Sequence, residues 1–141
     1  MPASRTRVDY KMFRSLQTRW ADNDIYGHMN NVVHYQLFDT AINGWLLEAG
    51  LLELNGETIY FVGETRCRYF AQLRFPQEIE AGFRLARVGR SSLTYEIGLF
   101  VKGQATAAAE GEFTHIQVAR EGHKSVSLSD DQRAKFTSVL V

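Results

Sequence analysis

The spacing of apolar residues changes along the chain, from a helical repeat in the first half to alternation in the second. In the first half they recur every three or four positions, at Tyr35, Phe38, Ile42, Trp45 and Ala49. This spacing predicts a helix of four or five turns with one apolar face. Asn30 or Asn31 is the expected N-cap of this helix, and Gly50 is the expected residue after its C-cap.

Alternating segments surround this helix. One spans residues 8–20, and four more span residues 58–75, 78–89, 92–101 and 104–119. The turns between the last four are too short for a parallel return, which needs about a dozen residues, so these strands must be antiparallel. The sequence therefore predicts an α+β fold, in which one long helix buries its apolar face against a single twisted sheet of about five strands.

The length of 141 residues, without a linker, repeat or low-complexity segment, predicts a single domain over residues 1–141. Its core is expected at about residues 8–119, followed by a polar tail, residues 120–141, with a short helix near residues 129–136. The sheet edges remain available to a second copy, so we expect a homo-oligomer.

Composition narrows the classes of protein that are possible. The longest apolar runs are a few residues, far short of the roughly 20 that a membrane-spanning helix requires, so no membrane insertion is expected. The first residues are polar and lack the apolar stretch of a signal peptide. The single cysteine, Cys67, cannot form an internal disulfide and is expected to be a small buried apolar residue. These features predict a cytoplasmic protein.

Charged residues cancel in total but are unevenly distributed. The 16 basic and 16 acidic residues give +4 over residues 1–19, −7 over residues 20–65, +4 over residues 66–90 and −1 over residues 91–141. The zero total argues against nonspecific nucleic-acid binding, which depends on many uncompensated Lys and Arg. An acidic loop and helix are thus set against arginine-rich strands.

The densest cluster of polar side chains lies just before the predicted helix, at residues 19–31. Counted from Asp22, an EF-hand calcium loop would need oxygen ligands at positions that Tyr26 and Val33 occupy. A transition-metal site at Asp22, Asp24 and His28 lacks a second His or Cys nearby. We therefore expect no metal here.

Acid, base or nucleophile chemistry by a carboxylate suits this position better. Asp24 lies shortly before a helix N-terminus, whose free N–H groups can polarise a substrate oxygen while the carboxylate faces the adjacent carbon. Acyl transfer uses such a pairing. Alternatively, Asp22 and Asp24 only cap the loop and the helix, which is the interpretation we adopt for Asp22.

The segment Arg19-Trp20-x-Asp22-x-Asp24-x-x-Gly27-His28-x-Asn30-Asn31 resembles the signature of hotdog-fold acyl-CoA thioesterases of the 4-hydroxybenzoyl-CoA thioesterase class. Phe38-Asp39-x-Ala41 follows it in the helix, and Arg66-Cys67-Arg68-Tyr69 and the turn at residues 89–93 extend the resemblance over about residues 8–119. The resemblance implies a hotdog fold, with the long helix wrapped by the sheet.

For the site, the resemblance implies that Asp24 acts as general base on water or as nucleophile. Gly27 matches the loop glycine of the family, and the backbone N–H at Asn31 or Val32 matches the donor to the thioester carbonyl. His28 matches a subgroup, including plant acyl-ACP thioesterases, in which it is proposed to assist catalysis. That subgroup has Asn where this chain has Tyr26, which favours chemistry by Asp24 alone.

The resemblance also implies how coenzyme A is held. Its phosphates would bind basic side chains near a strand turn at a subunit interface, which nominates Arg87, Arg90, Arg66 and Arg68, with Ser91 and Ser92 beside them. Otherwise these arginines are solvated strand side chains. No cofactor is required, because coenzyme A is part of the substrate, and at least a homodimer, with a homotetramer as the fuller expectation, would form.

The expected function is hydrolysis of an acyl- or aroyl-CoA thioester to a carboxylic acid and coenzyme A. Two alternatives remain, namely an acyl-ACP thioesterase and a non-catalytic hotdog module that binds acyl thioesters. The acidic segment over residues 20–65 disfavours the acidic carrier protein as a partner.

Overall fold

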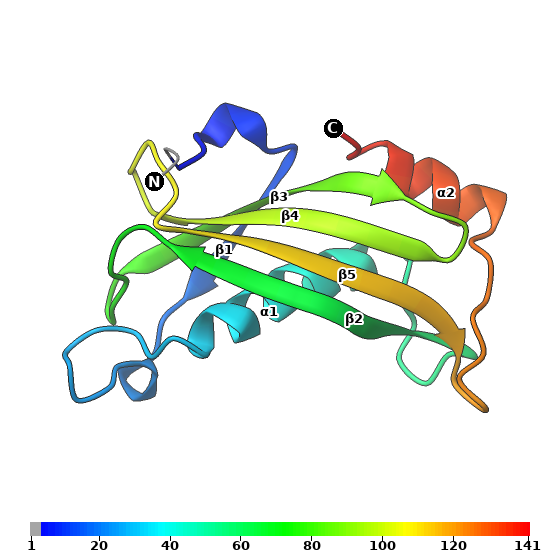
Figure 1. Cartoon of the computed structure of the whole chain (residues 1–141), viewed down its shortest axis with the longest axis horizontal. Coiled ribbons are helices and arrows are strands. Elements are labelled where there is room, and N and C mark those ends of the chain that lie inside the picture. Colours follow the sequence, from blue (N-terminus) through cyan, green and yellow to red (C-terminus); the bar gives the residue numbers. More distant parts are fainter. Residues whose placement is uncertain (1–3) are drawn as a thin grey trace.

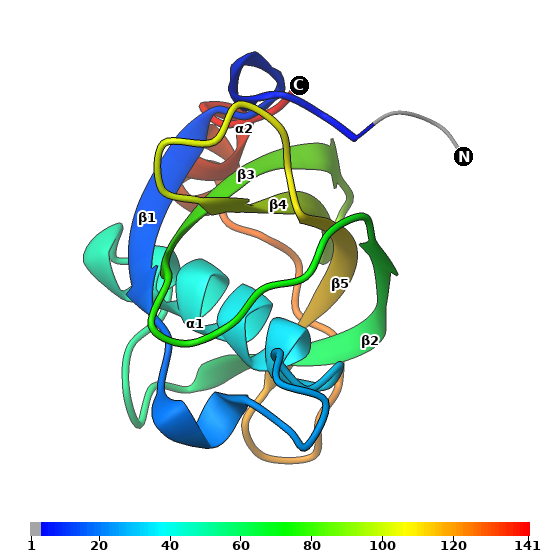
Figure 2. The ribbon, with the colours of Figure 1, turned by 90° about the vertical axis from the view of Figure 1, so that its left-hand side faces the viewer.

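Residues 4–141 are described by the computed structural model, in which a long helix lies against one face of a five-stranded antiparallel sheet (Figure 1). The helix is α1 (Val33–Glu48), and the strands are β1 (Met12–Gln17), β2 (Thr58–Tyr69), β3 (Glu78–Val88), β4 (Ser92–Val101) and β5 (Ala109–Ala119). Their order across the sheet is β1-β3-β4-β5-β2. Figure 2 shows the sheet curving around α1. The predicted α+β architecture is confirmed.

Helix α1 buries one face, as its apolar spacing predicted. Its buried residues are Val33, His34, Leu37, Phe38, Ala41, Ile42, Trp45 and Leu46. The helix ends as expected, because Gly50 has a φ of 72° and the next N–H, that of Leu51, bonds to the Leu46 oxygen at 2.8 Å. The predicted N-cap was wrong. Val32 is the N-cap residue, and the Asn30 side chain instead accepts a hydrogen bond from the Val32 N–H.

The first strand is shorter than predicted, because 3-10 turns at Arg7–Asp9 and Trp20–Asp22 flank it. In each turn an aspartate carboxylate accepts the N–H of the residue three positions earlier, which bends the chain out of the sheet.

Two other strand boundaries were also predicted wrongly. Strand β2 ends at Tyr69 rather than at residue 75, because the N–H groups of Phe70 and Ala71 both bond to the Ala108 oxygen as the chain leaves the edge. Strand β5 begins at Ala109 rather than at residue 104, because the preceding residues pair with the N-terminal segment. The Ala107 N–H, for example, bonds to the Arg5 oxygen.

The core between sheet and helix extends past residue 119. The helix α2 (Asp130–Thr137), which was predicted, places Phe136 against Trp45 and Tyr60 with ring centroids 5.8 and 6.4 Å apart. Leu128 and Val139 are buried in the same cluster. The tail that was expected to lie outside the core therefore covers one end of it. Within residues 4–141, no helix is long and apolar enough to cross a lipid bilayer.

Strand β2 lies at one edge of the sheet and holds the far end of α1. The Tyr60 hydroxyl donates a hydrogen bond to the Leu51 oxygen, just after the helix, at 2.8 Å. The Lys135 Nζ of α2 donates to the Ala49 oxygen at 2.9 Å. The carbonyl of the C-cap residue Ala49 and that of Leu51 in the following turn are thus both bonded by neighbouring elements.

Candidate active site

The predicted catalytic loop joins β1 to α1, and Asp22 holds its first turn together. The Asp22 carboxylate is only 2% exposed and accepts hydrogen bonds from the Arg19 backbone N–H at 2.7 Å and from its guanidinium Nη2 at 2.9 Å. Both oxygens are occupied by one residue of the same loop. The structural interpretation of Asp22 is therefore confirmed.

Asp24 begins a tight turn that closes on itself. Its N–H bonds to the His28 oxygen at 3.0 Å, and its own oxygen accepts the Gly27 N–H at 3.1 Å. Gly27 has a φ of 83°, which a side chain would oppose. The Asp24 Oδ1 accepts the Tyr26 N–H at 2.9 Å, while Oδ2 has no partner among residues 4–141. One carboxylate oxygen is thus fixed and the other is free.

The start of α1 leaves the backbone N–H of Asn31 free next to this turn. The Val32 N–H bonds to the Asn30 Oδ1 and the Val33 N–H bonds to the Asn30 oxygen, both at 3.0 Å. In the described part of the chain, the Asn31 N–H has no acceptor. The sequence left open whether the N–H of Asn31 or that of Val32 donates to the thioester carbonyl. Of these two, the Asn31 N–H is unoccupied.

A pocket of about 210 Å³ lies between this helix start and the end of β2. It is lined by His28, Met29, Asn31, His34, Tyr69, Phe70, Ala71, Gln72 and Leu73. The pocket brings together the predicted residues His28 and Asn31, whereas Asp24 and Gly27 do not line it. The His28 ring stacks against Tyr26, with centroids 6.2 Å apart, at the tip of the loop.

Two residues of this pocket, His34 and Tyr69, were not predicted to belong to the site. The Tyr69 hydroxyl donates a hydrogen bond to the Asn31 oxygen at 2.8 Å, and the His34 Nδ1 lies 3.2 Å from the same oxygen. His34 follows Asn31 by one helical turn, which is a signal that the sequence does carry. Tyr69 lies 38 residues away, and only the tertiary structure brings it here.

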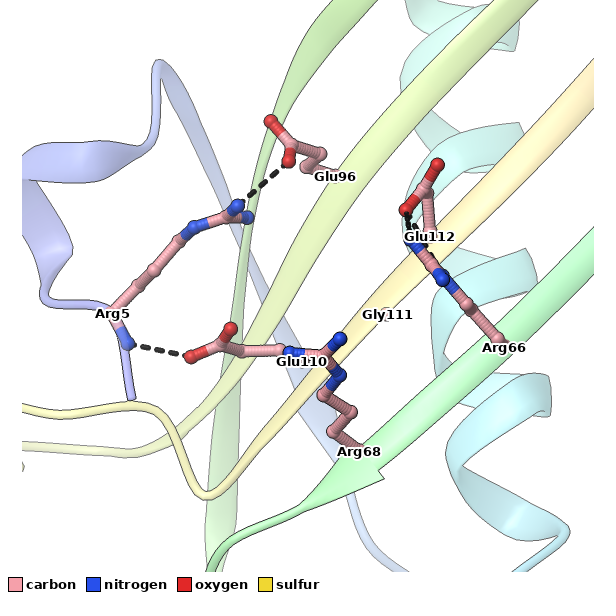
Figure 3. A pocket seen from close by; sticks show the side chains of 7 residues that line it. All are labelled: Arg5, Arg66, Arg68, Glu96, Glu110, Gly111 and Glu112. Carbon is pink, nitrogen blue, oxygen red and sulfur yellow. Dashed lines mark hydrogen bonds and ion pairs between the residues drawn. The ribbon is translucent and has the colours of Figure 1, made fainter. Parts of the chain in front are cut away.

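Arg66 and Arg68 lie on the outer face of the sheet, which is turned away from α1. Figure 3 shows Arg66 beside Glu112, with which it forms an ion pair, and Arg68 beside Glu110. Arg5 reaches the same surface from the N-terminal segment and pairs with Glu96 at 2.7 Å. Within one protomer these arginines do not face the pocket at the start of α1.

The other predicted coenzyme A residues, Arg87, Arg90, Ser91 and Ser92, lie at or beside the turn between β3 and β4. In Figure 1 this turn is at the opposite end of the sheet from the loop before α1. The Arg90 Nε donates a hydrogen bond to the Ser127 Oγ at 3.0 Å. A single protomer therefore does not bring this group together with Asp24.

A family model described as the thioesterase-like superfamily matches residues 18–136, which include the loop, α1 and all four following strands. The chain belongs to this superfamily. Membership supports a thioester hydrolase activity, and the resemblance read from the loop motif is confirmed.

Individual proteins share the sequence or the fold of this thioesterase-like chain. PA5185 of Pseudomonas aeruginosa, a crystal structure, is 44% identical, with a TM-score of 0.94 over 99% of this chain and 97% of that one. YsmA of Bacillus subtilis, an uncharacterised protein, is 26% identical over 134 residues, which are 94% of this chain and 90% of YsmA. Slr0204, a 1,4-dihydroxy-2-naphthoyl-CoA thioesterase from Synechocystis, is 15% identical with a TM-score of 0.79 over 89% and 94% of the two chains, a likeness of fold alone. The hotdog fold is confirmed.

Proposed function

We propose that this chain is an acyl-CoA thioesterase, which hydrolyses an acyl- or aroyl-CoA thioester to a carboxylic acid and coenzyme A. One observation carries the proposal. A carboxylate with a free oxygen, that of Asp24, is held in a turn next to a helix start whose Asn31 N–H is also free. The aroyl-CoA substrate in the name of Slr0204 supports the same class of thioester.

In this reaction the C–S bond breaks and a C–O bond to water forms. Asp24 takes a proton from the attacking water, or attacks the carbonyl itself to give an anhydride that water then opens. General-base help of this kind is worth about 10²–10⁴ in rate, and a donor such as the Asn31 N–H to the carbonyl oxygen about 10²–10³. His28, which lines the pocket, is a second acid or base. The coenzyme A thiolate leaves readily, so no metal or cofactor is needed.

We further propose that the site is completed by a second copy at the β2 edge. The first five residues of this strand, 58–62, carry no charge and no Pro, and Phe61 and Val62 are 40% and 50% exposed, although exposed edges are normally kept short or blocked. Antiparallel pairing of two β2 strands reverses one protomer relative to the other. The β3–β4 turn of the second copy then approaches the loop before α1.

This dimer would supply the arginines that one protomer keeps distant. Arg87 and Arg90, with Ser91 and Ser92, would meet the phosphates of coenzyme A bound at the neighbouring site, and Arg66 and Arg68 flank the shared edge. Two such dimers would form the expected tetramer. We place the reaction in the cytoplasm, where Cys67 stays reduced.

The test is thiol release from a panel of acyl-CoA and aroyl-CoA substrates, and from an acyl carrier protein thioester. We expect the wild type to release thiol and Asp24→Asn to lose at least about 10²-fold in kcat. Asp131→Asn on the exposed side of α2 is the matched control and should keep full activity.

Each other outcome has a distinct meaning. A wild type that turns over only the carrier-protein thioester would show that the carrier of the substrate is acyl carrier protein and not coenzyme A. A wild type that binds acyl-CoA without releasing thiol would make the chain a binding module. Full activity in Asp24→Asn would remove Asp24 from the mechanism.

A further inference from the structure

The main-chain oxygen of Asn31 joins two elements that are far apart in the sequence. Tyr69 ends the edge strand β2, and its hydroxyl donates to this oxygen at 2.8 Å. His34 lies in the first turn of α1, and its Nδ1 is 3.2 Å from the same oxygen. The two rings meet edge to face, with centroids 4.7 Å apart and planes at 83°.

The hydrogen bond to Asn31 decides which nitrogen of His34 carries the proton. A carbonyl oxygen only accepts, so Nδ1 must be the protonated nitrogen and Nε2 carries the lone pair when the ring is neutral. Burial lowers the pKa of His34, which favours the neutral ring. The side chain is 3% exposed and has no carboxylate partner among residues 4–141. The ring is therefore held as a neutral donor.

We propose that His34 and Tyr69 are positioning residues, which together clamp Asn31 so that its N–H points at the thioester carbonyl. This inference rests on the proposed thioesterase function and adds two residues to its site. Both peptide groups that flank the Asn31 Cα are then fixed. The first is held through the Asn30 oxygen, which accepts the Val33 N–H at 3.0 Å, and the second by the clamp together with the bond from the Val32 N–H to the Asn30 Oδ1.

Fixing both peptide groups matters because the donor must reach one point in space. Without the clamp, the peptide group after Asn31 would be held only by the bond from the Val32 N–H to the exposed Asn30 side chain, and rotation at Asn31 would then turn its N–H away from the carbonyl. A misplacement of about 1 Å in an active site can cost about 10²-fold in rate. The clamp therefore acts on kcat more than on KM, because the donor matters most when negative charge develops on the oxygen.

The test compares kcat and KM of four variants on an acyl-CoA that the wild type hydrolyses. Tyr69→Phe and His34→Ala should each lower kcat by about 10-fold or more, with KM changed less than about 3-fold. His34→Asn, whose amide N–H can replace Nδ1–H, should recover most of the loss. Tyr60→Phe is the matched control, because it removes an equivalent hydroxyl from the carbonyl at the other end of α1.

A second measurement tests the clamp independently of thioesterase activity. Amide hydrogen exchange over residues 28–35 should become faster in Tyr69→Phe and His34→Ala, and stay unchanged in Tyr60→Phe. The clamp is overturned if Tyr69→Phe behaves like Tyr60→Phe, or if His34→Asn is as impaired as His34→Ala. Should the wild type hydrolyse no thioester, the proposed function fails, and unchanged exchange over residues 28–35 would then overturn the clamp as well.

Discussion

The imidazole of His115 stacks on the ring of Tyr60, with centroids 5.3 Å apart and planes 19° from parallel. His115 is buried, and its Nδ1 has no hydrogen-bond partner among residues 4–141. Burial lowers the pKa of His115 to about 4. This histidine lies on β5, away from the loop that carries Asp24, so its charge state concerns stability rather than the proposed chemistry.

The stability of the protein should therefore fall between about pH 6.5 and pH 4. In this pH window His115 is protonated in the unfolded chain, where a His pKa is about 6.5, but it stays neutral in the folded protein. Protonation therefore favours unfolding. The contribution reaches about 3 kcal/mol at pH 4 and is absent at neutral pH. Urea unfolding of the wild type and His115→Phe at pH 7, 5.5 and 4.5 would show this difference. Parallel losses in both proteins would contradict it, and His123→Asn is an exposed control.

Gly111 should not tolerate a side chain. A Cβ at this position of β5 would collide with the ring of Phe38, which is fully buried at the centre of α1. We expect Gly111→Ala to lower the free energy of unfolding by about 1–3 kcal/mol, as overpacking does. In a double-mutant cycle with Phe38→Leu, the combined loss should be smaller than the sum of the single losses. An additive cycle would mean that the two residues do not compete for the same space.

The two aspartates of the loop should separate stability from activity. Asp22→Ala leaves the Arg19 N–H without its acceptor, and we expect a loss of about 1–3 kcal/mol in the free energy of unfolding. Asp24→Asn keeps the oxygen that accepts the Tyr26 N–H, so its unfolding should change by less than about 0.5 kcal/mol. Thermal or urea unfolding of both variants, alongside their thioesterase rates, checks this. Equal destabilisation by the two substitutions would show that Asp24 is also structural.

The β2 edge should control the oligomeric state. Val62→Lys places a charge at the proposed strand pairing, and we expect it to shift a dimer toward monomer in analytical ultracentrifugation. Val8→Lys, at a residue 90% exposed in the N-terminal segment, is the control. A monomeric wild type, or a Val62→Lys protein that dimerises with unchanged affinity, would rule out this edge as the interface.

Local patterns predicted the order of elements and the type of each one. The helix was visible because Phe38, Ile42 and Trp45 share a face that must be buried, and four strands were visible from alternation and short turns. Strand boundaries were predicted wrongly where the backbone of one segment bonds to a segment that is distant in the sequence. Residues 104–108 read as strand in the sequence, but their partner is the N-terminal segment, through contacts such as the bond from Ala107 to Arg5.

The residues of the candidate site likewise divide into those that a local motif predicts and those that only the tertiary structure brings together. Asp24, Gly27, His28 and Asn31 fall within eight residues, so the motif carries them together. Tyr69 could not be found, because no local pattern reports that the end of β2 meets the start of α1. For Arg66 and Arg68, alternation with Cys67, which was expected to be buried, puts both on the opposite face of the strand, but a local pattern does not show how that face lies relative to the loop that carries Asp24.

Strand β2 holds α1 at both ends with the same group. The Tyr60 and Tyr69 hydroxyls donate to the main-chain oxygens of Leu51 and Asn31, each at 2.8 Å. Residues 60–69 of the strand span about 30 Å at about 3.3 Å per residue, and the 16 residues of α1 span about 24 Å at about 1.5 Å per residue, with Asn31 and Leu51 just beyond its two ends. The spacing of the two tyrosines on β2 therefore matches the length of α1 and its flanking residues. An insertion or deletion of one residue in either element would detach one tyrosine, so we expect the lengths of β2 and α1 to vary only together.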